Sequence, residues 1–183
     1  MKKNLLSLAT VAAFGVGFGI GMLVLAPAAH AADGQIDFSG SVVSSSCVVN
    51  GGAPNFTITL PPVSTQSLGE TGKTAGRVPV PITLTNCTVG SKVRAHFDSG
   101  LTTKSIGRLA VDAGGAANVD LQLLNDGFTP VVAGAAPGAQ NTSFIPVSGT
   151  GAADLQYYVE YFSTGAATAG AVKSRVMYSI SYE

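Results

Sequence analysis

Apolar side chains recur at every second position through much of this chain, and this spacing limits the elements that it can form. Successive side chains of a β-strand point to opposite faces, so a period of two indicates a strand with one buried face. After residue 31 no long stretch has the spacing of an amphipathic helix. Alternating runs separated by Gly, Pro, Asn and Asp therefore predict an all-β sandwich. The clearest runs are at 56–60, 80–84, 93–97, 119–123, 155–161 and 172–182.

The first 31 residues form a different kind of segment. A basic start, Met1-Lys2-Lys3, precedes an apolar run at 5–25 and the small-residue site Ala29-His30-Ala31. The apolar run is long enough to resemble a transmembrane helix. The A-x-A site and the lack of basic residues directly after the run favour cleavage instead. We therefore predict a secretory signal peptide at 1–31, with Ala32 as the first mature residue.

The mature chain, 32–183, has the length of one domain with a sizeable core. Removing Lys2 and Lys3 leaves eight of the ten basic residues against ten acidic ones, a formal charge of −2. Basic residues this few and scattered do not suggest a nucleic acid partner.

Two cysteines, Cys47 and Cys87, are present in the chain. Export to an oxidising compartment predicts a disulfide between them, with two free buried thiols as the alternative. The closed loop of about 41 residues corresponds to roughly 4 kcal/mol in the chain-entropy model. A zinc site needs more ligands than these cysteines and one mature histidine provide.

Recognisable catalytic patterns are missing from the mature sequence. His96 is its one histidine, Asp98 would share a strand face with it, and no G-x-S-x-G motif supplies a nucleophile. We therefore predict no enzymatic activity, no cofactor, no metal site and no small-molecule substrate. A copper–zinc β-sandwich enzyme is disfavoured by the single histidine. A secreted carbohydrate-binding β-sandwich remains an alternative, although the chain has no tryptophan.

Three segments together resemble the pilins of the chaperone–usher pathway, type 1 fimbrial subunits in particular. "FSGSVVSSSC" at 38–47 is similar to the family's N-terminal motif, and "AGRVPVPITLTNC" at 75–87 to the segment leading to its second cysteine. "YFSTGAATAG" at 161–170, with Gly170 fourteenth from the end and Tyr182 penultimate, is similar to its C-terminal signature.

This resemblance implies an incomplete immunoglobulin-like β-sandwich at 42–183 that lacks its last strand. A strand from a neighbour would complete it, and residues 32–41 would be the corresponding donor strand of this chain. The implied donor residues share one strand face: Gly34, Ile36, Phe38 and Gly40. Ile36 and Phe38 would be apolar plugs, and Gly34 would pass a shallow pocket. The alternative is that 34–41 forms the first strand of the chain's own sandwich.

The resemblance gives the C-terminal strand a second role as the border of the groove and the contact for a periplasmic chaperone. The implied residues are Gly170, Val176, Tyr178, Ile180, Tyr182 and Glu183. Basic chaperone side chains would hold the terminal carboxylate of Glu183. Partners would be other copies of the chain or related pilins, the chaperone and an outer-membrane usher. The implied location is a cell-surface fimbrium.

The rank of the subunit is open in the sequence. The segment before Gly34 is shorter than in many major pilins, which is also seen in minor adaptor subunits. We expect a repeating shaft subunit, with a minor adaptor as the alternative. The sequence does not identify the surface to which a fibre would adhere or the helical geometry of the fibre.

Overall fold

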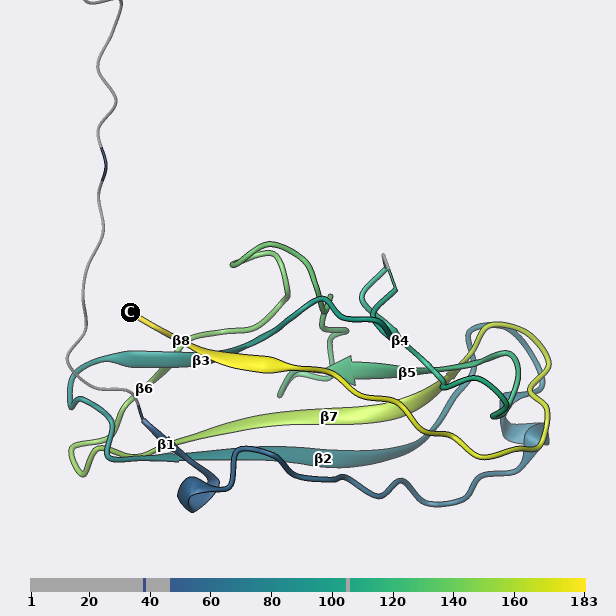
Figure 1. Cartoon of the computed structure of the whole chain (residues 1–183), viewed down its shortest axis with the longest axis horizontal. Helices are drawn as coiled ribbons and strands as arrows, with labels where there is room; N and C mark the ends of the chain where they lie inside the picture. The colour runs from purple at the N-terminus through teal and green to yellow at the C-terminus, as the bar shows by residue number, and fades with distance from the viewer. Residues whose placement is uncertain (1–37, 39–46, 105) are drawn as a thin grey trace, which may run out of the picture. The chain divides into compact units, whose positions relative to one another are not determined.

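The computed structural model of the chain describes residues 38, 47–104 and 106–183. Within these residues two antiparallel sheets form, and the all-β prediction is confirmed (Figure 1). The five-stranded sheet has the order β1 (Val48–Val49), β2 (Thr74–Thr85), β7 (Ala153–Ser163), β5 (Val119–Leu124) and β4 (Leu109–Ala110). The three-stranded sheet has the order β6 (Ile145–Pro146), β3 (Lys92–Phe97) and β8 (Tyr178–Tyr182). Two short 3-10 turns, η1 (Asn50–Gly52) and η2 (Thr65–Leu68), complete the described elements.

The long β2 and β7 strands pair with each other within the larger sheet. Its antiparallel register runs from Thr74 opposite Phe162 to Leu84 opposite Ala153, with one shift between Ala75 and Val78. The predicted alternation is confirmed here, because the inward-facing side chains are buried. They include Val80, Ile82 and Leu84 on β2 and Leu155, Tyr157 and Val159 on β7.

The two sheets face each other across a shared core. The Phe97 ring of β3 meets the Tyr157 ring of β7 edge-on, with centroids 5.0 Å apart. The Ala95 backbone N–H donates a hydrogen bond to the Tyr157 hydroxyl at 3.3 Å. Burial raises the pKa of Tyr157, and its hydrogen bond with Ala95 opposes this rise. The core is thus apolar contact between sheets, with one tyrosine hydroxyl satisfied inside it.

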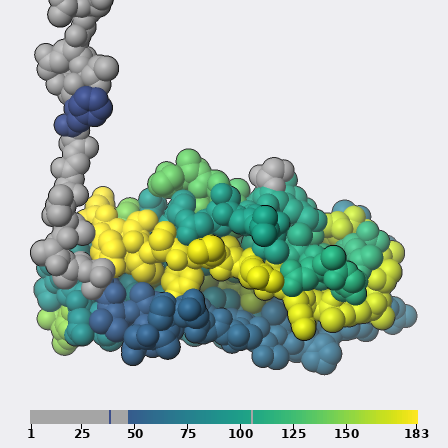
Figure 2. All heavy atoms as spheres, in the orientation of Figure 1, coloured from purple at the N-terminus to yellow at the C-terminus, as the bar shows by residue number. Residues whose placement is uncertain are grey.

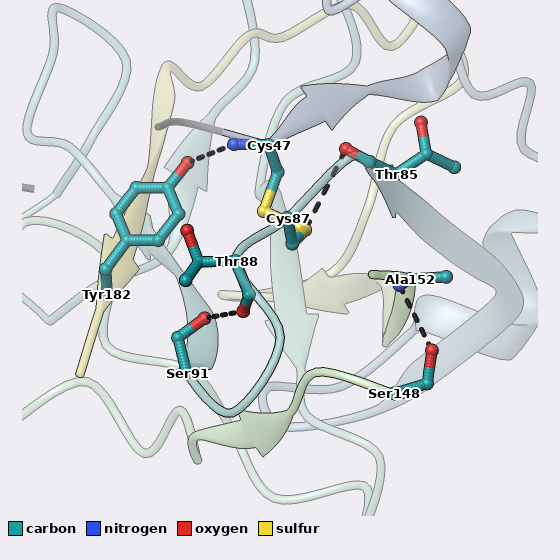
Figure 3. Close-up of a disulfide and its surroundings, with 8 residues drawn as sticks. All are labelled: Cys47, Thr85, Cys87, Thr88, Ser91, Ser148, Ala152 and Tyr182. Carbon is teal, nitrogen blue, oxygen red and sulfur yellow. Dashed lines mark hydrogen bonds between the residues drawn. A yellow bond between two sulfur atoms is a disulfide. The ribbon is translucent and has the colours of Figure 1, made fainter. Parts of the chain in front are cut away.

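The predicted disulfide between Cys47 and Cys87 is present (Figure 3). It links the residue before β1 to the residue that follows β2 by two positions. The Cys47 backbone N–H also donates a hydrogen bond to the Tyr182 hydroxyl at 3.0 Å. Cys47, where the described part of the sandwich begins, is therefore held by Cys87 beside the larger sheet and by Tyr182 of the smaller sheet.

Two predicted strands differ from the structure. Residues 56–60 form no strand, and the last strand is confined to Tyr178–Tyr182, not 172–182. Alternating apolar residues give both segments one apolar face, but a strand also needs a hydrogen-bonded neighbour. Within the described residues, neither segment has such a neighbour on the side that faces the other segment.

The predicted signal peptide at 1–31 lies outside the described residues, as do all residues of the predicted 32–41 donor strand except Phe38. No helix in the described part of the chain is long and apolar enough to cross a membrane.

Candidate strand-binding groove

A groove of about 550 Å³ opens into the core between the two sheets. Its floor is aliphatic and comes from β2, β5 and β7, including Ile82, Leu123 and Val159. Residues 54–60, called the first wall here, border it on one side. Residues 172–180, called the second wall, follow the other side, where 174–180 line the groove and Val172 lines a second hollow beside it. Figure 2 shows the yellow C-terminal segment and the blue segment after β1 side by side along this face.

The first wall follows η1 and pairs with no described strand. Among the described residues, the backbone N–H and C=O groups of 55–60 have no hydrogen-bond partner. Ile58 and Leu60 are half-buried against the core, whereas Phe56 is 38% exposed. The wall therefore combines an apolar inner side with unsatisfied backbone groups, which is the condition of an exposed sheet edge.

The second wall is bound along one edge only. The carbonyls of Lys173 and Met177 accept hydrogen bonds from the backbone N–H groups of Asp112 (2.8 Å) and Asp98 (2.9 Å). The Arg175 carbonyl accepts one from the Thr102 hydroxyl. In an extended chain the residues between them turn their backbone groups the other way.

The other edge of the second wall is unpaired within the described residues. The backbone groups of Val172, Ser174 and Val176 have no partner there. β8 continues this edge, since β3 is its one neighbour in the three-stranded sheet. The two walls thus present free backbone edges on opposite sides of an apolar floor. This arrangement can bind an extended strand.

Charge is concentrated away from the groove. The buried Glu160 carboxylate pairs with Arg77 at 2.9 Å, and the buried Asp120 carboxylate pairs with Lys104 and Arg108. Among the described residues that line the groove, one is charged, the exposed Arg175. Its chemistry is therefore backbone hydrogen bonding and apolar contact, which do not select a charged ligand.

A second hollow of about 390 Å³ is lined by the next residues of both segments, including Leu60, Val172 and Gly170. A Cβ atom on Gly170 would lie 2.7 Å from the Ala116 backbone nitrogen. Real side chains do not approach backbone atoms this closely. Gly170 is therefore required by the close passage of two backbone segments.

The predicted groove-border residues lie along one continuous segment. Val176, Tyr178 and Ile180 line the groove, and Gly170 lines the second hollow. Tyr182 instead reaches Cys47 with its hydroxyl. The remaining border residue, Glu183, forms an exposed ion pair with Lys92 at 3.0 Å.

One of the predicted donor residues is described. The side chain of Phe38 is 91% exposed. Gly34, Ile36 and Gly40 lie outside the described residues.

The role of the first wall was not predicted from the sequence. The alternation of Phe56, Ile58 and Leu60 indicated an ordinary strand. The signal was the pair Pro61-Pro62 that follows, because proline cannot donate to a ladder and is suited to an edge. The floor residues were recognised as core, and nothing in their pattern distinguishes a covered core from an open one.

Comparisons with known proteins agree with this geometry. The model of the family "FimA: Type-1 fimbrial protein, A" matches residues 60–183. The major fimbrial subunit SMF-1 of Stenotrophomonas maltophilia is 44% identical over 169 residues, covering 88% of this chain and 99% of that protein. The minor fimbrial subunit HifD of Haemophilus influenzae is 32% identical over 171 residues, covering 87% and 78%.

A solved structure shares the fold. The crystal structure of the P pilus rod subunit PapA matches with a TM-score of 0.60 and 16% identity, covering 75% of this chain and 99% of that one. At this identity the match concerns the fold alone.

Proposed function

Because the chain belongs to the type-1 fimbrial protein family, we propose that its groove binds an extended strand supplied by a neighbouring pilin. The chain is a structural subunit of an extracellular, cell-surface pilus, with the incomplete immunoglobulin-like sandwich of chaperone–usher pilins. Other copies of itself or related pilins are its partners.

One observation carries the proposal: two unpaired backbone edges flank a single apolar floor. A strand between them satisfies free N–H and C=O groups on both sides and buries alternate side chains. Left open, such edges would promote aggregation. A strand from outside therefore completes the sandwich, and a small molecule would leave the backbone edges unsatisfied.

Residues 32–41 have the properties of the strand to be donated. Their alternation places Gly34, Ile36, Phe38 and Gly40 on one face, and the Phe38 side chain is 91% exposed. The segment reaches roughly 33 Å when extended, enough to follow a sandwich from end to end. In this assignment 1–31 is removed on export and 42–183 is the pilin domain.

The same groove needs a temporary occupant before assembly. A periplasmic chaperone would supply a strand, pair with the edge at Tyr178–Tyr182 and hold the terminal carboxylate of Glu183 with basic side chains. An outer-membrane usher would then exchange this strand for a neighbour's. Such a subunit acts by assembly and carries out no reaction.

The shaft position is favoured over a minor adaptor. The major subunit SMF-1 is 44% identical to this chain and the minor subunit HifD 32%. A shaft subunit would be present in many copies per fibre and an adaptor in one. The carbohydrate-binding alternative has less support, since the groove is lined mainly by aliphatic residues and backbone.

The test is assembly of the mature chain with one donor residue changed. Phe38→Asp places a charge on the face that would enter the groove, and Ser39→Asp places the same charge on the opposite face. We expect the unchanged chain and Ser39→Asp to form multimers that resist unheated SDS. Phe38→Asp should remain monomeric, because a buried unpaired carboxylate is strongly unfavourable.

Equal assembly of both variants would contradict the donor assignment. Folded monomers of the unchanged chain at all concentrations would contradict the strand-binding role itself. Circular dichroism and the melting temperature establish that each variant is folded before its multimers are measured.

A further inference from the structure

A tyrosine side chain bridges the two walls of the groove. The Tyr178 hydroxyl, on the second wall, donates a hydrogen bond to the Pro54 carbonyl on the first wall at 2.7 Å. The Tyr178 ring also meets the Phe56 ring edge-on, with centroids 6.1 Å apart and planes at 71°. Within the described residues, no other hydrogen bond joins 54–60 to 172–182.

The position of this bridge is where a bound strand has to pass. Pro54, Phe56 and Tyr178 all line the groove. A strand lying between the walls needs about 4.8 Å to each neighbour and directs alternate side chains toward the floor. The half-buried Tyr178 ring occupies space on that side, and its hydroxyl uses a carbonyl of the opposite wall.

Tyr178 retains at neutral pH the hydroxyl proton that this hydrogen bond requires. The ordinary tyrosine pKa of about 10 is enough for this, and burial raises the pKa of Tyr178 further. Its acceptor is a backbone carbonyl that belongs to an otherwise unpaired segment. The bridge therefore satisfies one polar group of the open groove and holds its walls together.

We propose that Tyr178 acts as a latch across the empty groove, which a donor strand must open before it can bind along its full length. The inference rests on the proposed strand-binding function and adds a residue that controls its rate. The latch makes the groove selective, because a partner must replace both the hydrogen bond and the ring contact. A strand with free backbone groups and an apolar side chain can do so.

The experiment measures how fast a donor peptide enters the groove. The probe is a fluorescent peptide with the sequence of residues 32–46, added to the full mature chain carrying Ile36→Asp and Phe38→Asp. These two changes prevent the chain's own segment from competing. Fluorescence anisotropy gives the association rate, which is compared with and without Tyr178→Phe in this background.

Tyr178→Phe keeps the ring and removes the hydrogen bond. We expect it to speed peptide association by about twofold to tenfold, the range for one net hydrogen bond. Phe56→Leu, which removes the ring contact by another route, should also accelerate association. The matched control is Tyr158→Phe, because the Tyr158 hydroxyl has no hydrogen bond to any described residue. It should leave the rate unchanged.

Equal or slower association with Tyr178→Phe would overturn the latch while leaving strand binding established. Failure of the peptide to bind any folded variant would overturn the latch and the proposed function together. Acceleration by Tyr158→Phe as well would also overturn the latch, since the effect would then not depend on the bridge.

Discussion

The floor and the walls of the groove have similar sequences but different structures. On the floor, β2 and β7 alternate apolar and polar residues and form a continuous antiparallel ladder. The walls, 54–60 and 172–180, alternate in the same way, yet most of their length lies outside any ladder. Alternation thus predicts which side chains are buried. It does not tell whether the same chain supplies the neighbouring strand.

The difference between the floor and the walls should be largest when one isoleucine in each is truncated to alanine. Ile82 on the floor is 1% exposed, and its change to Ala should lower the free energy of unfolding by about 2–5 kcal/mol. Ile58 on the first wall is half-buried, so its change to Ala should cost about 1 kcal/mol in the free subunit. Urea denaturation of the monomer measures both values.

Assembly should change this pair of values. Once a strand covers the groove, Ile58→Ala should approach the cost of Ile82→Ala, because both sites are then enclosed. Similar losses in the free monomer would show that the first wall is already as well packed as the floor.

Gln140 provides a second test of the comparison, because its side chain hydrogen-bonds the backbone of Phe97 as a neighbouring strand would. Its buried amide accepts a hydrogen bond from the Phe97 N–H at 2.9 Å and donates one to the Phe97 carbonyl at 2.8 Å. Gln140→Leu removes the acceptor of the Phe97 N–H, whereas the Phe97 carbonyl keeps a second donor, the Gly134 N–H at 2.9 Å. The change should cost about 1–3 kcal/mol in urea denaturation. The exposed Gln66→Leu is the control and should change little. A small loss of unfolding free energy for Gln140→Leu would mean that an unsatisfied backbone group costs little even where it is buried.

Tyr182 connects the wall side of the molecule to the disulfide. Tyr182→Phe removes the acceptor for the Cys47 N–H and should cost about 1 kcal/mol. Tyr158→Phe again serves as the control. Equal melting temperatures for both variants would show that the disulfide alone fixes Cys47.

The smallest expected effect on stability at neutral pH comes from the ionisation of the core tyrosine, Tyr157. Burial raises the pKa of Tyr157 in the folded state above its unfolded value of about 10. The folded state therefore favours the neutral phenol, and this stabilisation is complete below pH about 10. It is lost as pH rises through the folded-state pKa. Thermal melting between pH 8 and 12 should fall more steeply for the unchanged chain than for Tyr157→Phe.

Much of the sandwich could be predicted from the sequence. The runs at 80–84, 93–97, 119–123 and 155–161 are strands because their apolar faces meet inside one chain. The disulfide followed from compartment and cysteine count. The Tyr178–Pro54 bridge could not be predicted, since it joins residues 124 positions apart through a backbone carbonyl. The resemblance identified Gly170, but it did not reveal the reason for a glycine there, which is the close approach of the Ala116 backbone.

The disulfide has a mechanical consequence for a chain joined to its neighbours through strands. Pulling on the segment before Cys47 loads Cys47 first, and the covalent bridge passes this tension to Cys87, two residues beyond the end of β2. Because β2 pairs with β7 along most of its length, many hydrogen bonds there resist the tension together. The two-residue β1 is thereby relieved of the load. A fibre of such subunits should lose tensile strength under reducing conditions well before its subunits separate.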